Sequence, residues 1–322
     1  DDQPLHPRCL AGGRMIWLGF LALALAGLAA APFLREAAKP TMDDTARRHA
    51  PGSFATLSRG VTHYRWLGAA RGPVAVCVHG LTTPSFVWQG VAQGLGAMGF
   101  RVLIYDLYGR GYSDRPDGPQ DSAFFVAQLE DLLEDQGIGG DITLLGYSMG
   151  GAIATAFAAL YPERLRQIVL IAPAGLGHDL GPMARLVARG NMVSSWLMRA
   201  VFPRVFHKST EAERDLPSSV EGIVDLQQDE LKYRGFVPAI ERSMSGMLSE
   251  DLAEAHVDIA EAGLPVLAIW GREDAIIPLS AMGRLAQINR NARQEVIEGA
   301  GHGLTYTHTE DVLHAMRDLM RD

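Results

Sequence analysis

Ser148 stands in a turn of small residues between an apolar run and an alanine-rich segment. The sequence LLGYSMGGA places this serine between Gly146 and Gly150. Residues 142–145 predict a buried strand, and residues 152–160 predict a buried helix. A Cβ at either glycine would clash with the facing chain, so the glycines permit a bend sharp enough to expose the hydroxyl. This G-x-S-x-G pattern is typical of a nucleophile elbow.

A serine hydroxyl is a weak nucleophile, so it needs a base, and the base needs a group that fixes its tautomer. The apolar run at residues 265–270 is followed by Glu273 and Asp274, which places carboxylates at a strand end. His302 follows a further short apolar run, in the glycine-rich loop EGAGHG. Because ligands of parallel sheets lie beyond the carboxyl ends of the strands, we expect these groups to lie near Ser148.

The elements that must position these groups alternate between strands and helices from about residue 61 onwards. This alternation indicates an α/β fold with a mostly parallel central sheet and helices on both faces. Continuous apolar, β-branched runs predict strands that are buried on both sides. The predicted strands are 74–78, 101–105, 142–145, 166–172, 265–270 and 294–297, and the clearest helices are 86–98 and 123–133.

Residues 175–263 interrupt this alternation with helical spacing and no convincing strand, and they are rich in methionine and aromatic residues. We expect a helical cap inserted in a core of residues 61–174 and 264–322. Each of these side chains is explained most simply as the cap's own core. As a set they predict an apolar, adaptable roof over the site. The candidate substrate contacts are Trp196, Phe236 and Met244.

Residues 15–34 contain no charged or strongly polar side chain. About 20 residues at 1.5 Å each span the roughly 30 Å of a bilayer's hydrocarbon. We expect a single-pass membrane anchor, in the inner membrane if the source is bacterial, between a tail (1–14) and a linker (35–60). The alternative is a signal peptide cleaved near the alanines at 29–31, which would give an exported protein. Basic residues flank both ends, so the side of the membrane stays open.

Composition excludes several other classes of protein. The net charge of −8 and the scattered lysines and arginines leave no basic face for nucleic acid. The two cysteines, Cys9 and Cys77, are too few for a disulfide framework or a metal site. The histidines show no metal-ligand spacing, so neither a metal nor an organic cofactor is expected. The oligomeric state is not predicted.

The elbow, the segment GREDAIIP at 271–278 and the segment GAGH at 299–302 together resemble the α/β-hydrolase superfamily. The resemblance covers essentially residues 61–322. The segment DLYGRGYS at 106–113 is similar to a loop of the same superfamily that shapes the site. We therefore expect Asp106 to hold that loop and to take no part in the chemistry.

The resemblance implies that Ser148 is the nucleophile, Asp274 the orienting acid and His302 the general base. Glu273 is the alternative acid, although the spacing to the following proline favours Asp274. His308 and His314 are alternative bases, but an exposed position on or near the terminal helix suits them better.

An oxyanion hole is implied by the same resemblance, since a tetrahedral intermediate needs preorganised donors. One donor would be the amide of Met149, which opens a helix where free N–H groups and the helix dipole favour an anion. The other would be the amide of Leu81, from the H-G-x motif that starts at His79. His79 itself is expected to fix the loop.

The motifs look most like those of bacterial carboxylesterases and monoacylglycerol-type lipases, on the G-x-S-M-G-G form and Trp88. This implies hydrolysis of a small or medium-sized, partly apolar ester through an acyl-enzyme on Ser148. Epoxide hydrolases and haloalkane dehalogenases of the superfamily carry aspartate at the elbow. Carbon–carbon hydrolases of ring-cleavage products typically have asparagine where Tyr147 stands. The alternatives are such a carbon–carbon hydrolase, a cofactor-free haloperoxidase or perhydrolase, and a non-catalytic ligand receptor.

Overall fold

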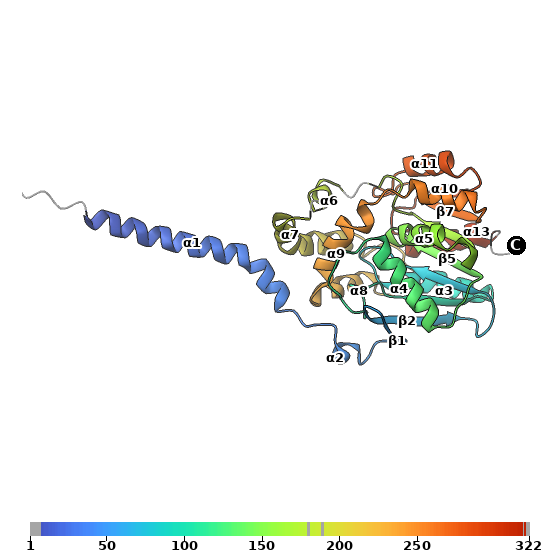
Figure 1. The fold of residues 1–322 in the computed structure, drawn as a ribbon, viewed down its shortest axis with the longest axis horizontal. Coiled ribbons are helices and arrows are strands. Elements are labelled where there is room, and N and C mark those ends of the chain that lie inside the picture. Colours follow the sequence, from blue (N-terminus) through green and yellow to red (C-terminus); the bar gives the residue numbers. More distant parts are fainter. Residues whose placement is uncertain (1–7, 179–180, 188–189, 318, 320–322) are drawn as a thin grey trace, which may run out of the picture.

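A long N-terminal helix, α1 (Arg8–Ala37), projects from an α/β body in this computed structural model (Figure 1). The structure describes residues 8–178, 181–187, 190–317 and 319. Within α1, the segment Ile16–Ala37 is long and apolar enough to cross a membrane, and a signal sequence would have the same properties. The predicted span 15–34 lies in this helix. Residues 1–7 of the predicted tail lie outside the described residues, and 8–14 continue the helix.

An eight-stranded sheet forms the centre of the body, in the order β1-β2-β4-β3-β5-β6-β7-β8. The pairs β1–β2 and β2–β4 are antiparallel, and every other pair is parallel, which confirms the mostly parallel sheet. The strands are β1 (Ser53–Leu57), β2 (Gly60–Gly68), β3 (Val74–Val78), β4 (Arg101–Tyr105), β5 (Ile142–Tyr147), β6 (Leu165–Ile171), β7 (Val266–Gly271) and β8 (Arg293–Ile297).

The first strand begins inside the segment 35–60 that the sequence predicts as linker. In β1 only Ala55 is buried, and Phe54 and Thr56 are exposed. An edge strand with one buried position lacks the continuous apolar run that identifies the central strands, and for this reason the sequence does not predict it. The sequence also does not predict β2, in which only Thr62 and His63 are buried. A short helix, α2 (Asp44–Arg47), is capped by Asp43 and connects α1 to this edge.

Two sets of helices cover the sheet (Figure 1). One set is α3 (Gln89–Ala97) and α13 (Thr309–Arg317), which pack against each other and the sheet, with the short α12 (Leu304–Thr307). The other set is α4 (Ser122–Asp135), α5 (Met149–Leu160), α10 (Ala253–Glu261) and α11 (Ser280–Ile288). Cys77 is buried in β3, where burial raises the pKa of its thiol, and the side chain of Cys9 lies outside the described part.

Between β6 and β7 the described residues form helices and no strand. The helices α6 (Gly181–Val187), α7 (Met192–Glu211), α8 (Ile223–Asp229) and α9 (Phe236–Ser245) form the inserted part, and α7 packs against α1. The predicted cap, 175–263, is too long at its carboxyl end. Helix α10 packs on α5 and α11, so it belongs to the layer that covers the sheet.

Candidate active site

Ser148 lies between β5 and α5 with φ +56° and ψ −120°. L-residues rarely adopt this region, and the conformation turns the chain sharply from strand to helix. A Cβ at Gly146 would collide with the backbone of Gly150, and a Cβ at Gly150 would collide with the carbonyl oxygen of Val78 in β3. The structure therefore has the tight bend that the two glycines predict.

Three groups far apart in the sequence meet at this bend. The Nε2 atom of His302 lies 3.0 Å from the Oγ atom of Ser148, and its Nδ1 atom lies 2.8 Å from an oxygen of Asp274. The other oxygen of Asp274 accepts the amide N–H groups of Ile276 and Ile277, at 2.8 and 2.9 Å. The buried carboxylate is therefore held in one orientation, with one oxygen directed at the imidazole.

The alternative acid and bases lie elsewhere. Glu273 is exposed and its amide bonds to the carbonyl of Ala300. His308 contacts the hydroxyl of Thr307 at 2.9 Å, and His314 is exposed on α13. Among the candidate acids and bases, Asp274 and His302 lie at Ser148, whereas Glu273, His308 and His314 do not line its pocket.

Tyr147 supports the histidine in a way that the sequence does not reveal. Its hydroxyl donates to the carbonyl of His302 at 2.9 Å, and its ring centre lies 5.4 Å from that of the imidazole. Because Tyr147 directly precedes Ser148, this bond connects the loop that carries His302 to the nucleophile turn. Its place beside Ser148 is the one sequence signal that could have drawn attention to it.

His79 fixes the loop that carries Leu81. The amide of Leu107 donates to Nε2 of His79 at 2.9 Å, so Nδ1 carries the proton and donates to the carbonyl of Gly80 at 2.8 Å. Burial lowers the pKa of His79 to about 4, which keeps the ring neutral. In a trans peptide the C=O and N–H groups point in opposite directions, so this bond turns the Leu81 amide away from His79. Arg110 holds the carbonyl of Leu81 at 3.0 Å.

The two amides expected to form the oxyanion hole have suitable positions. Met149 is the first residue of α5, and Leu81 lines the same pocket as Ser148. None of the hydrogen bonds in the described part of the chain uses either amide. The first amides of a helix have no partner within the helix, so the Met149 N–H is available to an anion. The oxyanion role of both amides stays a prediction.

Asp106 holds the neighbouring loop, as expected. One of its oxygens contacts Nδ1 of His63 at 2.7 Å and accepts the amide of Tyr112 at 3.0 Å, and the other accepts the amide of Ser85 at 2.9 Å. Burial alone would raise the pKa of Asp106, but His63 and these donors hold it well below its usual range. The residue does not line the pocket at Ser148.

A cavity of about 130 Å³ opens over Ser148. Its described lining contains no arginine, lysine or acidic side chain, and only His178 and Leu248 come from the inserted segment. Drug-sized ligands usually occupy pockets of about 300–1,000 Å³, so this one suits a small apolar group. No cluster of three or more metal-ligating side chains occurs among the described residues. The lining residues are Gly80, Leu81, Thr82, Thr83, Tyr147, Ser148, Ala174, His178, Leu248, Ile276, Ile277 and His302.

The three cap residues expected to contact substrate do not line this cavity. The indole N–H of Trp196 donates to the carbonyl of Leu28 in α1, at 3.3 Å. Phe236 is fully buried, and Met244 is 8% exposed in the same hydrophobic core. The inserted helices pack on one another and on α1. The methionine and aromatic side chains that the composition predicts as a roof over the site are used in this packing.

A family model described as serine aminopeptidase, S33, matches residues 69–308. The chain is 33% identical over 220 residues to the 2-hydroxymuconate semialdehyde hydrolase of Pseudomonas putida. The aligned region covers 65% of this chain and 73% of that protein. The chain is 26% identical over 258 residues to a pimeloyl-[acyl-carrier protein] methyl ester esterase of Aeromonas salmonicida, covering 77% of this chain and 95% of that protein.

The fold is similar to that of solved hydrolases. The enol-lactonase from Burkholderia xenovorans superposes with a TM-score of 0.70 at 20% identity, over 84% of this chain and 100% of that one. At this identity the likeness establishes the fold, and substrate preference must be argued from the pocket.

Proposed function

The chain belongs to the serine aminopeptidase S33 family of α/β-hydrolases, and from this premise we propose that it hydrolyses small carboxylic esters through an acyl-enzyme on Ser148. The observation that carries the proposal is the contact of 3.0 Å between Ser148 Oγ and His302 Nε2, with Asp274 held at Nδ1. These two contacts, at 3.0 and 2.8 Å, match those of a nucleophile, its base and the group that orients the base.

The reaction has two steps. As Ser148 Oγ bonds to the ester carbonyl carbon, His302 takes its proton, and the carbonyl π electrons move to oxygen. The amides of Leu81 and Met149 would stabilise this oxyanion. The intermediate collapses, the carbon–oxygen bond to the alcohol breaks, and His302 protonates the leaving alcohol. Water then attacks the acyl-enzyme with His302 as base, which releases the acid and restores the Ser148 hydroxyl.

The lining of the pocket favours an uncharged ester over a peptide. An aminopeptidase must hold the ammonium group at the start of its substrate, and a carboxylate is the usual partner for that charge. The described lining offers no acidic side chain. The cavity of about 130 Å³ also suits a short acyl group.

Carbon–carbon bond hydrolysis is the second candidate, supported by the 33% identity to the Pseudomonas enzyme. The semialdehyde in that enzyme's name retains a carboxylate. A pocket for such an anion would be expected to contain an arginine or lysine, and neither occurs in the described lining around Ser148. Tyr147 also departs from the asparagine expected there. We therefore rank ester hydrolysis first.

We also propose that α1 stays attached as a membrane anchor. Its carboxyl-terminal part contacts the body through several bonds and one ring contact, including a bond of 3.5 Å from Arg234 to the carbonyl of Ala37. Trp196 donates to the carbonyl of Leu28, the guanidinium of Arg199 lies 5.1 Å from the centre of the Phe33 ring, and Glu36 accepts an amide at 2.7 Å. Cleavage near the alanines at 29–31 would remove the contact between Trp196 and Leu28.

A chain-length series of nitrophenyl esters tests the acyl preference. We expect kcat/KM to be highest for acetyl to butyryl esters and to fall by about 10-fold or more for octanoyl, because long chains exceed the cavity. Leu248→Ala should move the optimum to longer chains, and Leu248→Phe should restrict it further, because Leu248 lines the cavity.

Leu216→Ala is the matched control, since Leu216 is exposed in the same insertion and should leave the series unchanged. Far-ultraviolet circular dichroism verifies that each variant is folded. A wild-type enzyme that prefers the longest esters would contradict the acyl assignment. Faster turnover of 2-hydroxymuconate semialdehyde than of any ester would favour the second candidate.

A further inference from the structure

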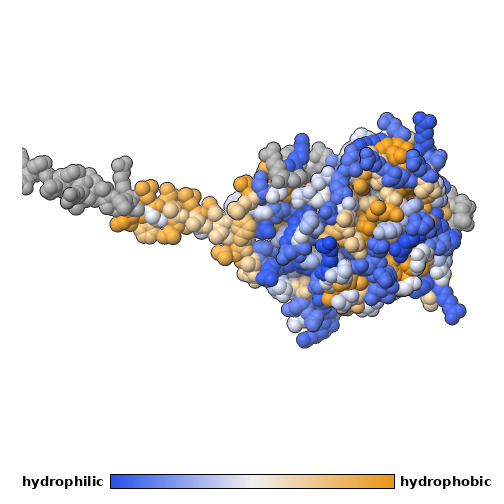
Figure 2. All heavy atoms as spheres, viewed as in Figure 1, coloured by the Kyte–Doolittle hydropathy of each residue, from blue (hydrophilic) through white to orange (hydrophobic). Residues whose placement is uncertain are grey.

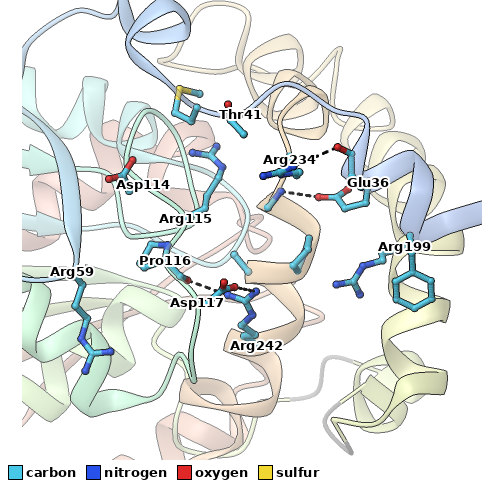
Figure 3. A pocket seen from close by; sticks show the side chains of 16 residues that line it. Glu36, Thr41, Arg59, Asp114, Arg115, Pro116, Asp117, Arg199, Arg234 and Arg242 are labelled. Carbon is cyan, nitrogen blue, oxygen red and sulfur yellow. Dashed lines mark hydrogen bonds and ion pairs between the residues drawn. The ribbon is translucent and has the colours of Figure 1, made fainter. Parts of the chain in front are cut away.

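A second cavity, of about 630 Å³, lies where the end of α1 meets the body, and none of its lining residues lines the pocket at Ser148. It is bordered by the end of α1, the turn between β1 and β2, the loop after β4, α7 and α9 (Figure 3). Five of its lining residues are arginines, which come from four separate parts of the chain. They are Arg59, Arg115, Arg199, Arg234 and Arg242.

The carboxylates of the cavity do not balance these cations. Of the three that line it, Glu36 is paired with Lys39 at 2.7 Å and Asp114 with Arg47 at 2.5 Å, and neither of those cations lines the cavity. The third, Asp117, pairs with Arg242, but its side chain is 96% exposed, so water screens the pair. Among the arginines, Arg199 is paired with Glu241, which does not line the cavity, at 2.9 Å. The arginines that have no such partner leave the cavity with a positive charge.

Two of the arginines have no carboxylate partner in the described part of the chain. The guanidinium of Arg59 lies 5.2 Å from the centre of the Phe124 ring, and Arg234 reaches the carbonyl of Ala37 at 3.5 Å. Each guanidinium carries five N–H donors in a planar fork that matches phosphate oxygens. Most of the donors of Arg59 and Arg234 are free for an anion.

Arg115 adds a buried donor to the same cavity. Its side chain is 8% exposed, and its two terminal nitrogens donate to the carbonyls of Ser113 and Gly111 at 2.6 and 3.0 Å. Its Nε atom is buried with no hydrogen-bond partner among the described residues. The nearest carboxylate, Glu230, lies 3.8 Å away, and burial raises the pKa of Glu230 to about 7. Glu230 is therefore only partly charged at neutral pH. A buried donor without a partner beside a cavity is costly unless a ligand accepts its bond.

The position of the cavity identifies the source of the anion. Phe33, Glu36 and Ala37 line it, and they are the last turns of the apolar helix. Trp196, a residue type that favours the membrane interface, contacts α1 beside it. The apolar surface of α1 continues to this junction with the body (Figure 2). A helix anchored in a bilayer would hold the cavity at the level of the lipid headgroups.

We propose that this arginine-lined cavity binds the phosphate group of an anionic phospholipid in the membrane that holds α1. The proposal rests on the anchor role of α1 and is independent of the ester chemistry at Ser148. The guanidinium groups of Arg59 and Arg234 would bind the phosphate oxygens, and the Nε atom of Arg115 would add one donor. The cavity volume of about 630 Å³ leaves room for the rest of a headgroup.

The test uses the full chain, reconstituted in an equal mixture of phosphatidylcholine and phosphatidylglycerol, extracted in mild detergent and examined by native mass spectrometry. The wild type should retain bound phosphatidylglycerol in preference to phosphatidylcholine. The double variant Arg59→Gln/Arg234→Gln should retain about 30-fold less, and the corresponding double lysine variant should be intermediate.

The control is Arg71→Gln/Arg290→Gln, which removes two exposed arginines from loops before β3 and β8 and should match the wild type. Thermal unfolding in the same detergent verifies the folding of each variant. Equal retention by the Arg59/Arg234 variant and the wild type would overturn the proposal. Displacement of the lipid by millimolar inorganic phosphate would overturn the lipid source, since the site would then take soluble phosphate.

Discussion

Ser148→Ala should lower kcat for short-chain esters by about 10⁴- to 10⁶-fold, the range found when a nucleophile that acts together with its base is removed. The variant lacks the Oγ atom that lies 3.0 Å from His302 Nε2, so no covalent acyl-enzyme can form. Residual hydrolysis would come from the donors and the pocket alone. Steady-state kinetics with nitrophenyl acetate and butyrate measure the loss.

Ser249→Ala is the matched control, because it removes an exposed hydroxyl outside the pocket and should leave kcat unchanged. Thermal unfolding of both variants should resemble that of the wild type. A Ser148→Ala enzyme with activity near the wild type would refute the assignment of the nucleophile.

Asp274→Asn should lower kcat by about 10⁴-fold, as expected for a base held in the wrong tautomer. One oxygen of Asp274 accepts the amides of Ile276 and Ile277, and an asparagine would keep its oxygen there. Its NH₂ group would then face Nδ1 of His302, so that Nδ1 must accept and Nε2 must carry the proton. A protonated Nε2 cannot take the proton of Ser148.

Glu273→Gln provides the comparison, since Glu273 is the neighbouring carboxylate and is exposed. Its kcat should stay within about twofold of the wild type, as for most surface substitutions. A heavy loss in Glu273→Gln together with an active Asp274→Asn would reverse the assignment of the acid.

The three groups at the bend could be predicted because each has a local signal. Ser148 has glycines on both sides, Asp274 follows a central strand, and His302 lies in a glycine-rich loop. Strands buried on both faces are also read easily from continuous apolar runs, and these strands set where the groups meet. The antiparallel edge of the sheet has no such signal, and neither β1 nor β2 is predicted from the sequence.

Contacts between distant segments could not be predicted in the same way. Phe236 and Met244 are apolar whether they face a substrate or the cap's own core, and the structure buries both in the core. The indole of Trp196 donates a hydrogen bond to the carbonyl of Leu28 in α1. Tyr147 matters through a hydroxyl that reaches His302, which no spacing along the chain reveals.

The arginine-lined cavity is the clearest example of this limit. Its five arginines are spread from residue 59 to residue 242, so along the sequence they look scattered. The packing of α1 against α7 and the folding of the β1–β2 turn, the loop after β4 and α9 around the same space bring them together. The pairing of the nearby carboxylates with other cations is equally invisible in the sequence.

Labelling with a fluorophosphonate tests the central claim most directly, because this reagent forms a stable covalent bond with an activated serine. Mass spectrometry of the intact wild type, followed by peptide mapping, should find a single adduct on Ser148. Ser148→Ala should remain unlabelled, and Asp274→Asn should react far more slowly. An ester-hydrolysing wild type that carries its adduct on another residue, or carries none, would contradict the account.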